Sequence, residues 1–236
     1  MSNVQDSAAA VACWSCHAAL NEQPLFCSHC GMIQPASAGD FFQVFGLPRA
    51  FRIDLEPLES TFHRLSRKLH PDRFARASEQ EREWSLANTA LLNDAYRTLK
   101  DPLHRTEYLL KLEGAEIGEQ HAGKNRKGDG NDISRVPADL LEEVFELNMQ
   151  LEEMRAARKM GETDPQLQSD LEGAKKKFDG LRDEVDVDLH RNWQIWDEGD
   201  AAARETAKTA MVALLDRRRY LSNLVRDVTE TLGQGS

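Results

Sequence analysis

At residues 65–74 the sequence reads LSRKLHPDRF, a basic helical segment that runs into His70-Pro71-Asp72. Pro71 has no amide hydrogen and disfavours the helical conformation of the residue before it, so we expect the helix to end near His70. The imidazole of His70 and the carboxylate of Asp72 are then left on an exposed turn. Core packing does not require such a turn, which indicates a surface that a partner contacts.

The helix that precedes this turn is predicted to begin after Asp54, a good N-cap, with Pro57 tolerated in its first turn. Its apolar residues recur at helical spacing and predict one buried stripe, made of Leu55, Leu58, Phe62, Leu65 and Leu69. Four basic residues lie off that stripe or just beyond the turn: Arg64, Arg67, Lys68 and Arg73. Basic charge clustered beside an exposed turn favours docking on an acidic partner surface.

A second helix is predicted to follow the turn. Ser78 and Glu81 form a capping box at its start, and the helix is expected to end before Asp101-Pro102. Asp101-Pro102 then begins a shorter helix that Gly114 terminates. Because roughly eight residues join the two long helices, we expect them to pack as an antiparallel pair.

All four cysteines lie near the N-terminus, at Cys13, Cys16, Cys27 and Cys30. Two CxxC pairs separated by ten residues can converge on one tetrahedral site, and four thiolates suit zinc. We therefore predict a structural zinc unit at 13–33, with His17 and His29 as bystanders. A redox dithiol is the alternative, although the βαβ pattern of a thioredoxin-like protein is absent. Residues 1–12 are expected to be disordered, and 34–39 to form a linker.

The C-terminal half shows three long helical patterns after a polar segment. Residues 115–136 are predicted to form a flexible connector. The helices are expected to begin at Pro137, at Asp164-Pro165 and at Asp200. Apolar stripes of this length with short joints predict a three-helix bundle over residues 137–232. The stripe of the second helix is Leu167, Leu171, Ala174, Phe178, Leu181, Val185 and Leu189, and that of the third is Ala203, Ala207, Met211, Leu214, Leu221, Val225, Val228 and Leu232.

The helix after Pro137 has more apolar surface than one bundle helix requires. A complete core stripe consists of Leu140, Val144, Leu147, Leu151 and Met154. A second ridge, rotated by about 100° from the first, consists of Leu141, Phe145 and Met149. The ridge either widens the core, contacts the preceding domain, or forms an exposed patch for a partner. Tyr220, beside three arginines on the third helix, is expected to join such a patch.

The composition of the chain excludes several classes of function. Of 236 residues, 30% are charged, and the net charge of −10 argues against nucleic-acid binding by the chain as a whole. No apolar run approaches about 18 residues, so no membrane span is expected. Residues 1–12 contain no Arg or Lys, which predicts a cytoplasmic protein without a secretory signal or transit peptide. The sequence shows neither a nucleotide-binding loop nor paired carboxylates, the motifs that would indicate an enzyme.

The His70-Pro71-Asp72 turn between two amphipathic helices resembles the J-domain of DnaJ-type co-chaperones. The segments FGLP at 45–48, FRID at 51–54 and DPLHRTEYLL at 101–110 resemble the HscB branch, which serves iron–sulfur cluster biogenesis. The tetracysteine unit is similar to that of mitochondrial members of this branch. The resemblance implies an all-α, L-shaped protein: a J-domain helical hairpin at 40–114 and a three-helix bundle at 137–232, preceded by the small zinc-ribbon-like knuckle unit.

The resemblance also implies a function without enzymatic activity of its own. The J-domain would dock on an HscA/DnaK-type ATPase chaperone and stimulate ATP hydrolysis through His70, Pro71 and Asp72, with Arg64, Arg67, Lys68 and Arg73 meeting an acidic surface. The bundle would deliver the scaffold protein IscU. The family's scaffold-binding positions match Leu141, Phe145 and Tyr220, with the acidic Glu146 beside them and Met149 on the same ridge. A J-protein for a different client remains the alternative, and a CxxC thiol–disulfide oxidoreductase is a further one.

Overall fold

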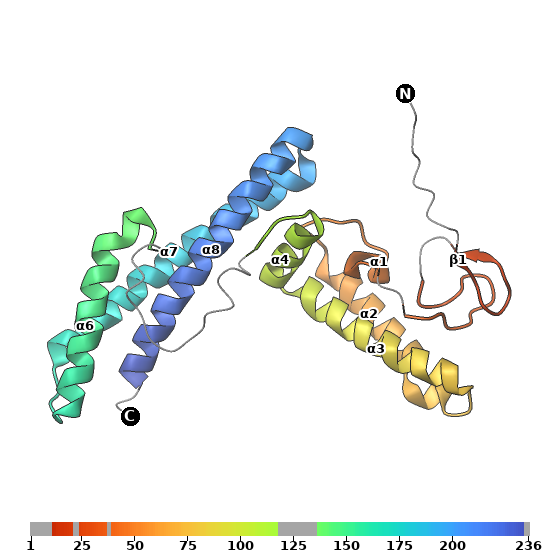
Figure 1. Cartoon of the computed structure of the whole chain (residues 1–236), viewed down its shortest axis with the longest axis horizontal. Coiled ribbons are helices and arrows are strands. Elements are labelled where there is room, and N and C mark those ends of the chain that lie inside the picture. Colours follow the sequence, from red (N-terminus) through yellow and green to blue (C-terminus); the bar gives the residue numbers. More distant parts are fainter. Residues whose placement is uncertain (1–10, 21–23, 37–38, 118–135, 234–236) are drawn as a thin grey trace. The chain divides into compact units, whose positions relative to one another are not determined.

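The computed structural model of the chain describes residues 11–20, 24–36, 39–117 and 136–233. These residues fall into two units, one up to Leu109 and one from Leu110 (Figure 1). The described residues are mostly helical, which confirms the predicted all-α class. The L-shaped arrangement of the two units stays a prediction.

The first unit begins with a small cysteine-containing segment. Strand β1 (Val11–Ala12) pairs antiparallel with strand β2 (Ala19–Leu20), so ordered structure starts within the segment 1–12 that was expected to be disordered. Residues 1–10 lie outside the described residues, as do residues 118–135 of the predicted connector.

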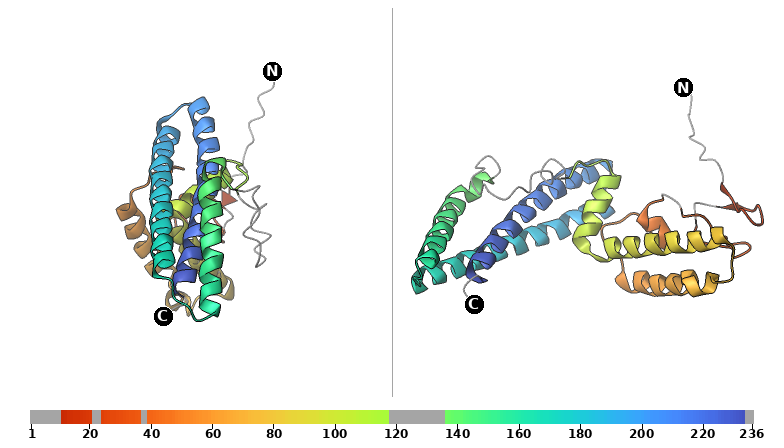
Figure 2. Two further views of the ribbon diagram at one scale, coloured as in Figure 1. Left: turned by 90° about the vertical axis from the view of Figure 1, so that its left-hand side faces the viewer. Right: turned by 60° about the horizontal axis from the view of Figure 1, so that its bottom comes forward.

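Four helices and one 3-10 turn follow in the first unit. They are α1 (Phe41–Phe45), α2 (Leu55–Leu69), η1 (Pro71–Phe74), α3 (Glu79–Lys100) and α4 (Pro102–Leu112), the last of which spans the boundary between the units. Helices α2 and α3 lie side by side (Figure 2, right), as predicted.

Local sequence signals account for where these helices begin. The side chain of Asp54 accepts a hydrogen bond from the Glu56 amide at the start of α2. Ser78 and Glu81 form the predicted capping box, with Glu81 accepting from the Ser78 amide at 3.0 Å. Helix α2 ends at Leu69, two residues before Pro71, because proline disfavours the helical conformation at His70.

A buried arginine fixes the base of the hairpin. The Arg105 side chain donates from Nε to the carbonyl oxygen of Phe51 at 2.7 Å and from Nη1 to that of Leu99. Of the predicted α2 stripe, Leu58, Leu65 and Leu69 are buried and Phe62 is half-buried, but Leu55 is 45% exposed. Leu55 is the first residue of α2.

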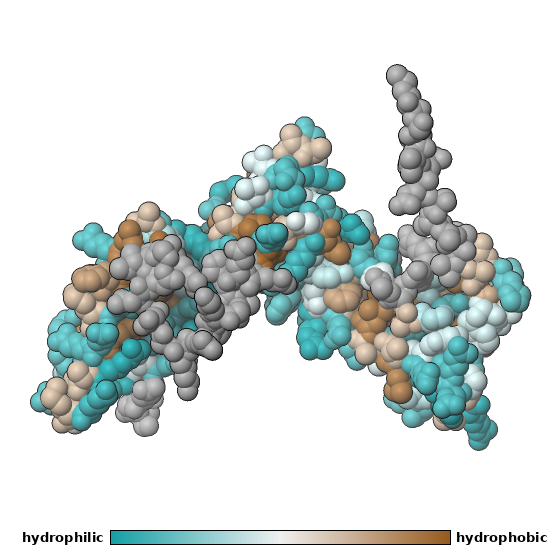
Figure 3. Space-filling view, viewed as in Figure 1, coloured by the Kyte–Doolittle hydropathy of each residue, from teal (hydrophilic) through white to brown (hydrophobic). Residues whose placement is uncertain are grey.

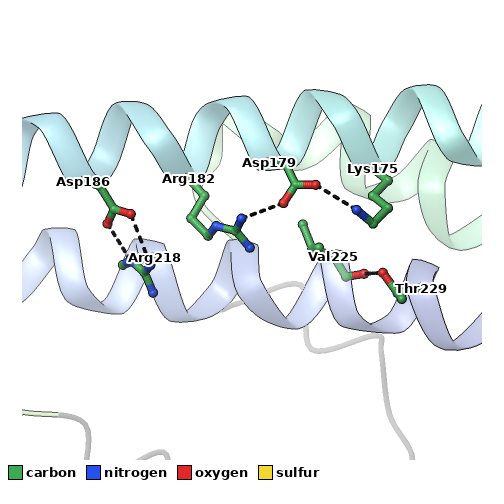
Figure 4. A network of polar contacts seen from close by, with 7 residues as sticks. All are labelled: Lys175, Asp179, Arg182, Asp186, Arg218, Val225 and Thr229. Atoms are coloured by element: carbon green, nitrogen blue, oxygen red, sulfur yellow. Dashed lines mark hydrogen bonds and ion pairs between the residues drawn. The ribbon is translucent and has the colours of Figure 1, made fainter. Parts of the chain in front are cut away.

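The second unit is a three-helix bundle. After the end of α4, its described helices are η3 (Ala138–Leu140), α6 (Leu141–Lys159), α7 (Pro165–Glu198) and α8 (Ala201–Gly233). The two long helices α7 and α8 form an antiparallel pair, and α6 packs against both. Figure 4 shows one polar link between the long helices, where Arg218 of α8 donates two hydrogen bonds to the carboxylate of Asp186 on α7.

The core of the bundle follows the predicted stripes at most positions, although Ala174, Leu181, Ala203 and Leu232 are only half-buried. All five predicted residues of the first helix are buried. On α7 the stripe extends beyond Leu189 to Trp193 and Trp196. On α8 the buried residue is Leu215 and not the predicted Leu214, which is only half-buried.

Candidate docking surfaces and metal site

The His70-Pro71-Asp72 turn is exposed. The side chains of His70 and Asp72 are 59% and 90% exposed. The His70 ring accepts a hydrogen bond through Nδ1 from the Asp72 amide at 3.3 Å, which caps η1. The Arg73 amide closes the turn on the His70 carbonyl oxygen at 2.9 Å. The turn therefore presents an imidazole and a carboxylate that make no core contact.

The four predicted basic residues are all exposed beside this turn. Arg64, Arg67 and Lys68 lie on α2, and Arg73 lies on η1. Within the described part of the chain, Arg64 and Arg73 have no carboxylate partner. Lys68 places its Nζ 5.9 Å from the centre of the Phe26 ring, in the cysteine unit. This face therefore carries positive charge that the described residues do not neutralise.

The four cysteines converge as predicted and are positioned to bind a metal ion. All four Sγ atoms lie within 4.8 Å of one another. Two of the separations are 3.7 Å, between Cys13 and Cys30, and 3.8 Å, between Cys16 and Cys27. Sulfur atoms about 2.3 Å from a central ion lie roughly 3.8 Å apart at the corners of a tetrahedron. The thiols thus have tetrahedral metal spacing, and none is in a disulfide.

Two equivalent knuckles, residues 13–18 and 27–32, hold the thiols. In each, the amide of the first cysteine donates to the carbonyl oxygen of the last residue, Ala18 or Met32, at 2.9 and 2.8 Å. The amide of the fifth residue of the knuckle donates back to the carbonyl oxygen of the first cysteine, at 3.0 and 2.9 Å. That fifth residue, His17 or Gly31, is in the left-handed region, with φ of 58° and 75°. His17 thus occupies a turn position, and its bystander role stays a prediction.

Backbone amides favour the thiolate at the first cysteine of each knuckle. Burial raises the pKa of the Cys13 thiol, but the amides of Cys16 and Ser15, together with the thiols of Cys30 and Cys16, lower it to about 6. Backbone amides of the second knuckle lower the pKa of Cys27 in the same way. The Ala18 amide lowers the pKa of Cys16, yet burial and the neighbouring thiols raise it to about 12. Four thiolates this close require a cation among them.

Substitution at the two left-handed positions tests this geometry. Gly31→Ala will weaken metal binding about tenfold, because a β-carbon in the left-handed region costs about 1–2 kcal/mol. His17→Ala, at the equivalent position, will leave the affinity within about twofold, because histidine already carries a β-carbon there. Competition with a chromogenic chelator measures both. A large loss for His17→Ala would mean that its imidazole is a ligand.

The cysteine unit is attached to α3 through residues that sequence reasoning did not identify. Gln34, expected in a linker, is 3% exposed, and its Nε2 donates to Cys13 Sγ at 3.4 Å. Its carbonyl oxygen accepts from the Nδ2 of buried Asn88 at 2.8 Å. The rings of Trp14 and Trp84 meet edge to face, with centroids 5.5 Å apart. Polar residues in a linker and mid-helix carry no periodic signal, so only packing reveals their pairing.

The ridge on α6 is exposed. Leu141, Phe145 and Met149 are 41%, 65% and 54% exposed, whereas every residue of the core stripe on the same helix is at most 4% exposed. Figure 3 shows tan and brown surface over the α6 region among hydrophilic surface. Of the interpretations left open by the sequence, the wide core is therefore wrong, and within this unit the ridge is an apolar surface open to solvent.

An ion pair connects η3, just before α6, to the part of α8 that carries Tyr220. Arg217 donates to both carboxylate oxygens of Asp139, at 3.0 and 2.7 Å, and its donation lowers the pKa of Asp139. Tyr220 lies one turn further along α8 and is half-buried, and this burial raises the pKa of its phenol. Glu146 is exposed and lines a shallow groove between α6 and α7.

An exposed His-Pro-Asp turn that ends a basic helix, paired with a second antiparallel helix, defines a J-domain protein. No family model matches the sequence. The chain is, however, 32% identical over 216 residues to the iron–sulfur cluster co-chaperone protein HscB of Mus musculus. The matched region covers 90% of this chain and 79% of the mouse protein. A match at 50% identity over 78 residues to an HscB homolog of Vibrio cholerae covers 33% of this chain and 46% of that protein.

Solved structures agree with this assignment. Chaperone HscB from Vibrio cholerae matches with a TM-score of 0.57 and 28% identity, over 83% of this chain and 99% of that one. The crystal structure of human co-chaperone protein HscB matches in fold with a TM-score of 0.63 and 24% identity, over 93% and 98%. The chain therefore belongs to the HscB family of co-chaperones.

The helices of the described residues are too short or too polar to cross a membrane.

Proposed function

We propose that this co-chaperone docks on an HscA/DnaK-type ATPase chaperone through its J-domain, stimulates ATP hydrolysis there, and delivers the iron–sulfur scaffold protein IscU through its C-terminal bundle. The observation that carries the proposal is the presence of two exposed surfaces of opposite chemistry, one in each unit. One is the basic face of α2 with the His70–Asp72 turn, and the other is the apolar ridge of α6. The similarity to the mouse protein, an iron–sulfur cluster co-chaperone, supports the same pathway.

The basic face favours an acidic chaperone surface. Exposed charges such as Arg64 and Arg67 contribute mainly to the rate and orientation of encounter. Their effect falls as salt screens them, with a Debye length of about 8 Å at physiological ionic strength. The His70–Asp72 turn then makes the specific contact. Binding to the chaperone is therefore expected to weaken as salt is raised.

The ridge of α6 favours an apolar client surface. Leu141, Phe145 and Met149 project from consecutive turns of one helix, an arrangement suited to a hydrophobic groove or patch on a partner. Acidic side chains such as Glu146 border the ridge and provide a polar rim. Tyr220 is proposed to extend the patch from α8.

Steady-state ATP hydrolysis by the cognate chaperone tests the proposal. The rate is measured with this chain alone, with the scaffold alone and with both. We expect stimulation by the chain, and a larger stimulation with both proteins present. An unrelated folded protein in place of the scaffold serves as the control. Absence of stimulation by the chain would contradict the proposed J-domain function, and equal stimulation by the control protein would point to a different client.

We propose that zinc occupies the tetracysteine site, because four thiolates in tetrahedral positions suit this ion. The purified chain is expected to contain one zinc ion per molecule. Chelation will unfold residues of the cysteine unit while the helical circular dichroism signal of the rest persists. Elemental analysis measures the metal. Metal-free protein with reversible thiol oxidation and disulfide reductase turnover would instead support the oxidoreductase alternative.

A further inference from the structure

A groove of about 790 Å³ lies in the first unit between the second knuckle and the helical hairpin. Phe26 and Met32 line it on the side of the cysteine unit. Arg64, Lys68 and Arg73 line it on the side of α2 and η1. The basic face proposed for chaperone docking is thus one wall of a groove, and the cysteine unit forms the other wall.

The charge of the groove is strongly one-sided. Three basic side chains line it, and Glu81 is the one acidic residue among the described residues that line it. The Glu81 carboxylate is committed to the capping box of α3, where it accepts hydrogen bonds from the Ser78 amide and hydroxyl. Apolar side chains, including Phe45 and Leu65, complete the lining. The groove is therefore suited to a ligand that is both acidic and partly apolar.

The cysteine-unit wall is held in place by specific contacts. Asn88 of α3 donates to the Gln34 carbonyl oxygen, and Gln34 in turn donates to the Cys13 thiol. On another side of the unit, Trp14 packs against Trp84. Lys68 spans the groove, with its ammonium group near the Phe26 ring. The wall is thus connected both to the metal site and to the hairpin.

We propose that the cysteine unit forms the second wall of the chaperone-docking site, and that the groove takes an acidic segment of the ATPase chaperone that carries an apolar side chain. This inference rests on the proposed function. It assigns to the cysteine unit a role in chaperone recognition. The supporting argument is charge complementarity: Arg64, Lys68 and Arg73 line one wall and lie beside the His70–Asp72 turn that the chaperone is proposed to contact.

A pair of matched substitutions tests the cysteine-unit wall. Met32 and Ala18 occupy equivalent positions in the two knuckles, both half-buried, but only Met32 lines the groove. Met32→Glu adds a negative charge to the groove and is expected to weaken binding of the full chain to the ATP-bound chaperone about tenfold at low salt. Ala18→Glu adds the same charge elsewhere and is expected to leave the affinity within about twofold. The metal content of both variants is measured alongside.

A third substitution acts in the opposite direction from outside the cysteine unit. Glu81→Gln removes the acidic charge of the groove but keeps a side chain that a capping box accepts. The affinity for the chaperone is expected to rise about threefold. If Met32→Glu lowers the metal content, the affinity of Glu81→Gln for the chaperone tests the groove instead, because Glu81 lies on α3 and not in the knuckles.

The outcomes separate this inference from the proposed function. Equal affinities for Met32→Glu and Ala18→Glu at full metal content would contradict the proposed role of the groove, and so would an unchanged affinity for Glu81→Gln. Either result leaves the proposed function intact as long as the wild-type chain stimulates the chaperone. No stimulation by the wild-type chain would overturn both. Weakening by Met32→Glu that disappears at high salt, together with tightening by Glu81→Gln, supports the groove.

Discussion

His70→Gln will reduce stimulation of the chaperone's ATP hydrolysis by roughly thirtyfold, the loss typical of a hot-spot side chain. The imidazole is exposed and makes no core contact, so the free energy of unfolding should change by less than about 0.5 kcal/mol. The backbone hydrogen bond that closes the turn, from the Arg73 amide to the residue-70 carbonyl oxygen, does not depend on the side chain. Steady-state ATPase assays and thermal unfolding measure the two effects separately.

His63→Gln is the matched control. His63 lies on α2, the helix that ends at the turn, its side chain is 62% exposed, and the substitution is chemically identical. Stimulation should remain within about twofold of the wild type, because surface substitutions away from a binding element have small effects. Equal losses for the two variants would show that charge or helix propensity, and not the turn, matters. Undiminished stimulation by His70→Gln would contradict the proposed role of the turn.

The second large effect is expected on the ridge of α6. Leu141→Ala combined with Phe145→Ala will weaken binding of the scaffold at least about thirtyfold, because exposed apolar anchors dominate interface energetics. The free energy of unfolding should fall by less than about 1 kcal/mol, since both side chains are largely solvated in the isolated unit. Isothermal titration with the scaffold and urea unfolding measure the two quantities.

Two controls define what this result means. Leu147→Ala removes a residue of the buried stripe on the same helix and should cost about 2–5 kcal/mol of stability. Met160→Ala removes an exposed apolar side chain at the end of α6, away from the ridge, and should leave scaffold affinity within about twofold. A stability loss for the ridge variant as large as that of Leu147→Ala would mean that the ridge is packed against other parts of the protein.

Much of the fold could be predicted because its helices carry local start and stop signals. Asp54, the Ser78–Glu81 capping box and Asp164 cap helices where the sequence indicates. The stripe on α6 is strictly periodic, and all of its predicted members are buried. On the long helices the prediction was less complete. Trp193 and Trp196 continue the α7 stripe at the same spacing, but the predicted stripe stopped at Leu189.

The candidate sites were predictable to different degrees. The CxxC spacing is enough to place four thiols together, and a turn at His70-Pro71-Asp72 follows from proline geometry. The surroundings of the cysteine unit were not predictable. Gln34 and Asn88 are polar residues in segments whose composition suggests solvent exposure, and their burial depends on each other. A mutual dependence of this kind leaves no trace in the spacing of residues along the chain.

The turn after α2 is exposed, yet little of its backbone is free to move. Pro71 restricts one dihedral angle, the His70 ring holds the Asp72 amide, and the Ala75 amide bonds to the Asp72 carbonyl oxygen. A recognition element that is ordered before binding loses little conformational entropy when a partner contacts it. A small contact can then be selective without being long-lived. A short-lived complex would suit the proposed function, in which the chain leaves the chaperone after ATP hydrolysis.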